Sequence, residues 1–242
     1  MNAPLHGLVT IVIASALGCG TTPPPAPVEP EKKEEVKDKK KNDGPSIEYD
    51  LGGVDPNVAK AKFNALKSTW NDCFADARKK NETLSGKLTL TIRTLKDGSV
   101  KWAYVTQTDL GDRSVEKCVI DSVKSTNFGA PMDAKEGEIK AYSYGWELDD
   151  DDRPADPGAA SNVLPSIEKA KGKLNDCKKR ASASGTVSAT IYVKKGGKPA
   201  SIGIAIDDPS ADGAIDCIVE VLSKLTYSNK SSWTIKSTVQ LP

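Results

Sequence analysis

Four of the five cysteines fall into two similarly placed pairs, and this repetition constrains the fold more than any other feature of the chain. The motif Asn71–Cys73 (Asn-Asp-Cys) recurs as Asn175–Cys177. Cys118 and Cys217 then follow their motifs at similar intervals, each at a fixed distance from a glycine. The sequence therefore predicts a duplicated small domain with two cysteines in each copy.

Four cysteines allow three disulfide pairings. The duplication favours the pairing within each copy, which joins Cys73 to Cys118 and Cys177 to Cys217. A zinc site built from the same residues would need ligands in close pairs, and the chain has no C-x-x-C motif. We therefore expect structural disulfides and no metal. Such bonds form in an oxidising compartment, which predicts a location in the cell envelope or outside the cell.

Hydrophobic periodicity gives the order of elements in the first copy. Apolar residues spaced by three and four predict a helix over 63–77 and another over 115–123. Alternating apolar residues predict strands near 88–92 and 103–105, with Gly98 in the turn between them. A last strand is predicted at about 138–147, and the second copy repeats the whole order.

These patterns predict an α+β protein of two tandem αββαβ modules. Each module would have a three-stranded sheet, helices on one face and one disulfide of its own. The first module is expected over 56–148 and the second, diverged module over 161–242. The acidic, Pro-containing segment 149–160 between them is interpreted as a solvated linker, because it lacks the ligand spacing of a calcium loop.

The N-terminus is typical of an export signal, which we place at 1–18. The apolar run Leu8–Leu17 is too short to span a bilayer. The segment Ala16–Cys19 resembles the lipobox of bacterial lipoproteins, which implies that Cys19 is lipidated. Ala16 stands where a lipobox usually has leucine, and an ordinary secretory signal that leaves Cys19 unpaired is the alternative. Lipidation would account for the odd number of cysteines.

The segment 19–55 is rich in Pro, Lys and Glu and is predicted to be disordered. Such a composition suits a tether that holds the folded residues away from a membrane. A solubilising spacer without a selected length is the alternative.

The first copy also resembles a known family. Over about 57–148 it is similar to the AgmX/PglI C-terminal domain, a TonB-C-like module of myxobacterial and related envelope proteins. The segments that carry the likeness are Gly86–Ile92, Asp97–Val100, Thr108–Asp112, Val115–Cys118 and Phe128–Pro131. The resemblance implies an α+β envelope module, and it supplies no catalytic residues. The second copy looks like a diverged relative that keeps both cysteines and Gly185.

Little in the sequence points to catalysis. The only histidine, His6, lies in the predicted signal, which excludes histidine-dependent catalysis and metal binding in the mature chain. No phosphate-binding or nucleophile motif occurs. With 34 basic and 33 acidic residues, the chain has a formal charge of +1, so nucleic acid is not an expected partner. We predict a protein that is not an enzyme and has no cofactor.

One group of aromatic residues suggests a partner surface. Trp102 and Tyr104 alternate with Ala103, so they should face away from the helices. A second group lies on one side of the last strand and comprises Tyr142, Tyr144 and Trp146. Exposed aromatic clusters often mark interfaces. The alternative is that these residues pack on the second copy or on the linker, or lie in the core.

The predicted function is that of a lipid-anchored protein-binding or scaffold module in an envelope complex, with an unidentified envelope protein as its partner and a possible link to motility or the cell surface. The anchor would place the folded residues in the periplasm or at the cell surface, and an outer-membrane anchor is favoured over an inner-membrane one. Two alternatives remain open. One is a periplasmic small-ligand receptor or enzyme that uses a cleft between the modules, and the other is envelope attachment without a specific ligand.

Overall fold

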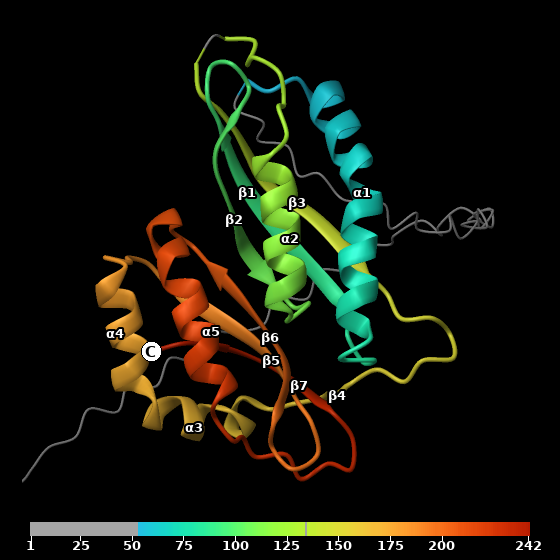
Figure 1. Cartoon of the computed structure of the whole chain (residues 1–242), viewed down its shortest axis with the longest axis vertical. Coiled ribbons are helices and arrows are strands. Elements are labelled where there is room, and N and C mark those ends of the chain that lie inside the picture. The colour runs from blue at the N-terminus through green and yellow to red at the C-terminus, as the bar shows by residue number, and fades with distance from the viewer. Residues whose placement is uncertain (1–52, 134) are drawn as a thin grey trace, which may run out of the picture. The chain divides into compact units, whose positions relative to one another are not determined.

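The computed structural model describes residues 53–133 and 135–242, and within them it contains two separate β-sheets with helices packed against each (Figure 1). The mixed α+β class predicted from the sequence is confirmed. The predicted signal peptide (1–18), Cys19 and the tether up to residue 52 lie outside the described residues.

The first sheet is formed by the residues before the acidic segment. Its elements are α1 (Pro56–Arg78), β1 (Gly86–Thr94), β2 (Val100–Thr108), α2 (Arg113–Lys124) and β3 (Gly137–Trp146). The strand order is β2-β1-β3, and both pairings are antiparallel. In Figure 1, α1 and α2 lie side by side on one face of this sheet.

Local sequence signals account for the ends of these helices. The carboxylate of Asp55 accepts hydrogen bonds from the backbone nitrogens of Asn57 (2.8 Å) and Val58, and Pro56 occupies the first helical turn. Asp112 caps α2 in the same way. An N-cap carboxylate satisfies backbone N–H groups that have no partner inside the helix, so each aspartate stabilises the start of its helix.

The second sheet has four strands in the order β4-β7-β5-β6. The strands are β4 (Asp156–Pro157), β5 (Val187–Val193), β6 (Pro199–Ile206) and β7 (Ile235–Gln240). The helices are η1 (Ala160–Asn162), α3 (Leu164–Lys169), α4 (Lys171–Arg180), η2 (Pro209–Ala214) and α5 (Ile215–Ser223), of which η1 and η2 are 3₁₀ helices.

Two features of this part differ from the sequence-based prediction. The sheet has four strands instead of three, because Asp156–Pro157 from the presumed solvated linker pairs in parallel with β7. The expected single helix is divided at Ala170 into α3 and α4. Gly172 lies in the first turn of α4, and glycine lowers the intrinsic stability of a helix, which is consistent with a break at this position.

Glycines form the tight turns of both hairpins, as predicted. Gly98 has φ 82° in the turn between β1 and β2, and Gly197 has φ 86° in the turn between β5 and β6. A Cβ atom at either position would overlap backbone atoms of a neighbouring loop, at Gly129 and Tyr227 respectively. Positive φ and close approach therefore both require glycine here.

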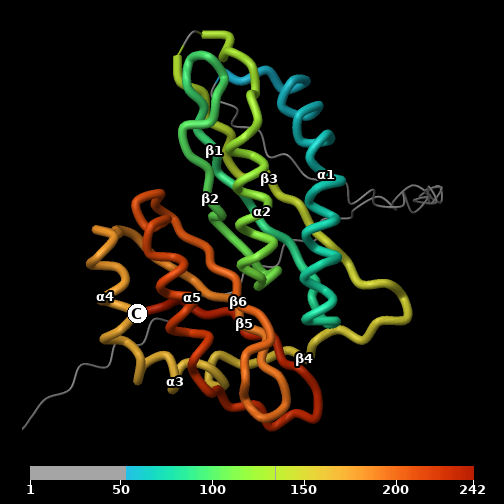
Figure 2. Tube along the Cα trace, viewed as in Figure 1, coloured from blue at the N-terminus to red at the C-terminus, as the bar shows by residue number. Residues whose placement is uncertain are grey.

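The two sheets meet through their edge strands. Figure 2 follows the trace and shows β2 and β6, which are far apart in sequence, lying side by side. The apolar cluster of the first sheet includes Tyr192 and Ala205 from the second, and the cluster of the second includes Tyr104 from the first. Each half of the described chain thus completes part of the core of the other.

Candidate functional site

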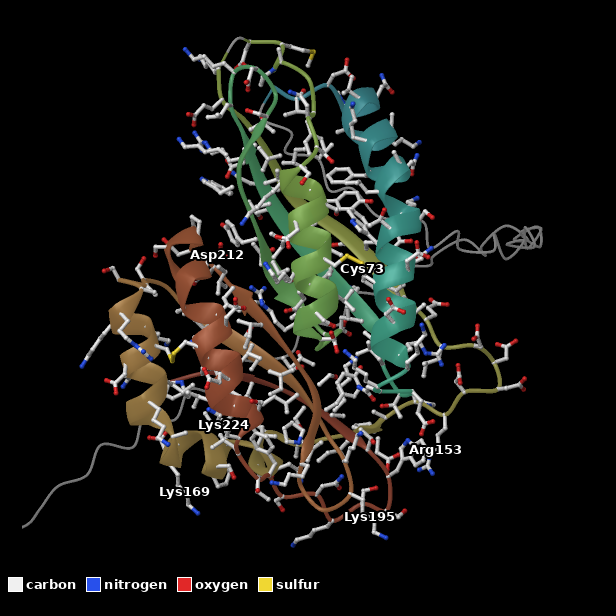
Figure 3. All side chains as sticks on the ribbon, in the orientation of Figure 1. Cys73, Arg153, Lys169, Lys195, Asp212 and Lys224 are labelled. Carbon is white, nitrogen blue, oxygen red and sulfur yellow. A yellow bond between two sulfur atoms is a disulfide. The ribbon has the colours of Figure 1, made fainter. Side chains whose placement is uncertain are left out.

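The four cysteines form two disulfides, Cys73–Cys118 and Cys177–Cys217 (Figure 3, where Cys73 is labelled). The first joins α1 to α2, and the second joins α4 to α5. Their sequence separations are 45 and 40 residues. This is the pairing that the duplication predicted. Each bond restricts the unfolded chain by about 4 kcal/mol on the chain-entropy model, so we assign both a structural role.

The aromatic residues of β3 do not form an exposed surface. Tyr142 is fully buried, and its ring stacks on that of Phe63 with the centroids 3.6 Å apart. Trp146 stacks on Phe74 under α1 at 5.3 Å. Tyr144 is half-buried and meets the ring of Trp70 edge to face. The predicted partner surface on this strand is therefore corrected: these side chains belong to the core beneath α1.

An irregularity in β3 explains part of this difference. Ala141 has φ 57°, and the register between β1 and β3 shifts between Leu90 and Ile92. Because of this bulge, Ile139 and Tyr142 both point inward, although they are three residues apart. Simple alternation could not have predicted that pattern.

Trp102 and Tyr104 do face away from α1 and α2, but they are covered by the second half of the chain. Tyr104 is only 7% exposed, and Trp102 packs beside it against the core of the second sheet. The prediction of an exposed partner surface is therefore corrected for this pair as well. The structure instead agrees with the alternative, in which these two aromatic residues pack on the second copy.

Polar contacts reinforce this junction between the halves. The Tyr192 hydroxyl donates to the carbonyl of Ser85 at 2.8 Å, and the Thr190 hydroxyl donates to that of Thr108 at 2.9 Å. Side chains of both halves share the two apolar clusters, and each of the two cavities described below is lined by one half alone.

Glu116 is the most unusual ionisable residue of the junction. It lies in α2 and is fully buried, and its Oε2 atom accepts a hydrogen bond from the backbone nitrogen of Ile204 at 2.9 Å. Burial raises the pKa of Glu116 to about 8, while the Ile204 N–H and the charge of Arg113 act in the opposite direction. No sequence pattern marked this residue, because helical periodicity places charged residues outside unless another element covers them.

The first cavity is a polar groove of about 570 Å³ on the outer face of the first sheet. Hydroxyl, amide and charged groups line it, among them Thr89, Thr91, Thr106, Gln107 and Ser143. The Thr89 and Ser143 hydroxyls are hydrogen-bonded to each other at 2.8 Å, and Thr106 donates to the carbonyl of Thr89. Much of the polar surface is therefore already occupied by contacts within the sheet.

The second cavity is a groove of about 510 Å³ between α4 and α5. Its rims carry four basic and two acidic residues, and its floor contains Ala170, Val221, Leu225 and the sulfur of Cys217. Helical periodicity alone could not show that α5 and the disulfide turn one side of α4 into a groove.

The described residues offer little else that marks a site. Among them, no group of three or more His, Cys, Asp and Glu side chains could hold a metal ion. No helix within 53–133 and 135–242 is both long and apolar enough to cross a membrane. Comparison of the chain with protein-family models, with curated proteins and with solved structures gave no match.

Proposed function

We propose that this chain is an exported lipoprotein, anchored through Cys19, that acts as a protein-binding or scaffold module in a cell-envelope complex. The observation that carries the proposal is the pair of disulfides, because structural disulfides persist in oxidising compartments outside the cytoplasm. The export signal and the lipobox-like segment before Cys19 agree with that location.

The finer architecture belongs to the same proposal. We interpret the described residues as two αββαβ modules that arose by duplication and diverged. Equivalent cysteines and turn glycines support this interpretation, as does the likeness of the first module to the AgmX/PglI C-terminal domain. The added strand β4 and the divided α3–α4 helix are then features of the second module alone.

The junction between the modules suits a scaffold. Buried side chains and hydrogen bonds from Tyr192, Thr190 and Glu116 hold the sheets together, so surfaces on both modules keep a fixed relation. A lipid anchor would fix the location of such a platform, and the segment 19–55 would set its reach. The mechanism is docking, without chemical conversion of a substrate.

Lipidation is tested by expressing the full chain and its Cys19→Ser variant in a bacterium fed an alkyne-bearing fatty acid. We expect the wild type to take up the label and to sediment with membranes, and the variant to do neither. A Thr22→Ser variant is the matched control and should behave as the wild type. Equal labelling of the Cys19→Ser variant, or an unlabelled wild type in the cytosol, would refute the proposal.

A further inference from the structure

The groove between α4 and α5 combines an apolar floor with a positively charged rim. Lys169, Lys173 and Arg180 follow one another along the α3–α4 side, and Lys224 lies at the end of α5. Figure 3 labels Lys169 and Lys224, which come from the two sides of the groove. The opposing charges are Asp176 and Glu220, so basic residues outnumber acidic ones by four to two.

Two of the four rim cations have no acidic partner within the described residues. Lys224 forms an ion pair with Glu220 at 2.5 Å. Lys169 and Lys173 are exposed and form no ion pair with any described carboxylate. Nη2 of Arg180 lies 2.9 Å from the Cys217 sulfur, which places the guanidinium over the disulfide at the groove. An anionic ligand would therefore meet available cations here.

The floor is apolar and open to solvent. Cys217 and Val221 lie in α5 and Leu225 follows its end, and each of the three is half-buried. Burying an apolar side chain against such a floor removes its surface, and that of the floor, from water. The groove can thus hold an apolar group at its base while the rims neutralise acidic groups on either side.

The corresponding positions of the first half lack all four cations. Aligning Cys73 with Cys177, and Cys118 with Cys217, places the four rim cations opposite Ala65, Thr69, Asp76 and Ser125. The α-helices and the disulfide are present in both halves, so neither the helix packing nor the disulfide requires this charge. The basic rim is a separate property of the second half.

We infer that the groove between α4 and α5 binds an acidic segment of a partner protein that inserts one or two apolar side chains against Val221 and Leu225. A folded or extended peptide can reach the floor and pair with the rims at once. A flat anionic membrane would contact only the rims, and an inorganic phosphate would make no use of the floor. The inference rests on the proposed protein-binding function, but it does not depend on the lipid anchor.

The test measures fluorescence anisotropy of two labelled peptides mixed with the purified full chain. One peptide contains glutamates with a leucine at every fourth position, and the other has serine in place of each leucine. We expect the leucine-containing peptide to bind about tenfold more tightly than the serine peptide, and its binding to weaken at high ionic strength. Equal binding of the two peptides would overturn the inference, because the floor would then play no part.

Charge variants locate the site. Lys169→Glu combined with Lys173→Glu should weaken binding of the leucine peptide about tenfold or more. The matched control is Lys194→Glu with Lys195→Glu, which reverses two exposed lysines in the β5–β6 turn and should change affinity less than about twofold. All four positions are exposed, so circular dichroism and thermal melting should show both variants folded. Equal losses of affinity in both variants would mean that the peptide is attracted nonspecifically, and this result would overturn the proposal.

Two further measurements separate other ligands. Vesicles of anionic phospholipid that bind the chain more tightly than the peptide does, in a manner abolished by Lys169→Glu and Lys173→Glu, would assign the groove to a membrane. Self-association of the chain that these changes abolish, without competition from the peptide, would assign it to a second copy. Either result overturns the inference but leaves the Cys19 labelling unaffected, so it is distinguishable from failure of the proposed function.

Discussion

The Oε2 atom of Glu116 lies 2.9 Å from the backbone nitrogen of Ile204, so a carboxyl group from α2 satisfies a hydrogen-bond donor on the free edge of β6. An edge strand exposes unpaired backbone groups, and a buried one needs a partner for each. Gly203 makes the approach possible, because a Cβ at that position would overlap Oε1 of Glu116 and the backbone at Gly111. One side chain of α2 thus links the two halves and satisfies one N–H group of an edge strand.

This contact predicts a pH-dependent stability. The folded-state pKa of Glu116, about 8, is above the ordinary glutamate value of 4.5, so the folded protein keeps a proton that the unfolded chain releases. The stabilisation is complete below about pH 4.5 and is lost as pH rises towards 8, by at most about 1.4 kcal/mol per pH unit. Glu116→Gln should flatten this slope and be more stable than the wild type at pH 9, as measured by urea denaturation across pH.

The charges of Asp112 and Arg113 act on Glu116 and remain in place in the variant. Glu147→Gln, at an exposed position, is the control and should leave the slope as it is in the wild type. An unchanged slope in Glu116→Gln would show that this carboxyl does not retain a proton in the folded protein.

The disulfides should contribute similar amounts of stability. Replacing Cys177 and Cys217 together by alanine should lower the free energy of unfolding by about 4 kcal/mol, and replacing Cys73 and Cys118 should do nearly the same. The reason is that the closed loops differ by only five residues, 45 against 40. Urea denaturation under oxidising conditions measures both. A double variant as stable as the wild type would contradict the structural role of its bond.

Removing the hydroxyl group should change the stability of the protein differently at two buried tyrosines. The Tyr142 hydroxyl is buried and has no hydrogen-bond partner among the described residues, whereas that of Tyr192 donates to Ser85. Tyr142→Phe should therefore be neutral or stabilise by up to about 1 kcal/mol, and Tyr192→Phe should destabilise by about 1 kcal/mol or more. Thermal melting of the two variants side by side checks this. Destabilisation by Tyr142→Phe equal to that by Tyr192→Phe would show that its hydroxyl has a partner.

The acidic segment should be held by Trp233. Its indole nitrogen donates to the carbonyl of Pro154 at 3.0 Å, and Arg153 lies 4.8 Å above its ring. Ser231 also donates to Asp156 at 2.7 Å. Trp233→Ala should release the segment and speed its cleavage by endoproteinase Asp-N severalfold, as followed by mass spectrometry. Lys230→Ala is the control. Unchanged cleavage of Trp233→Ala would mean that β4 alone secures the segment.

The predictions from sequence succeeded where short-range chemistry decides the structure. Glycines turn both hairpins, and alternation located β1 and β5. The predictions failed where the structure depends on contacts between distant segments of the chain. Asp156–Pro157 has no strand signal of its own and pairs only because β7 offers an open edge. The bulge at Ala141 likewise depends on the fit of β3 to β1.

The candidate groove could be predicted only in part. The comparison of Lys169 with Ala65 and of Lys173 with Thr69 was available in the sequence and marks the charge as specific to the second half. The position of the apolar floor was not available, because it depends on how α5 packs beside α4. The burial of Glu116 was equally hidden, since its hydrogen-bond partner, the backbone nitrogen of Ile204, belongs to the other half of the described chain.

By itself, the sequence determined the α+β class and the partners of the four cysteines. Periodicity and spacing are local or repeated signals, so they can be interpreted without knowledge of the fold. Only the tertiary structure decided which faces are covered: Trp102 and Tyr104 face outward from their own sheet, yet they lie beneath the second one. The reason is physical, because the pattern of a strand tells which side chains share a face, while burial depends on what packs against that face.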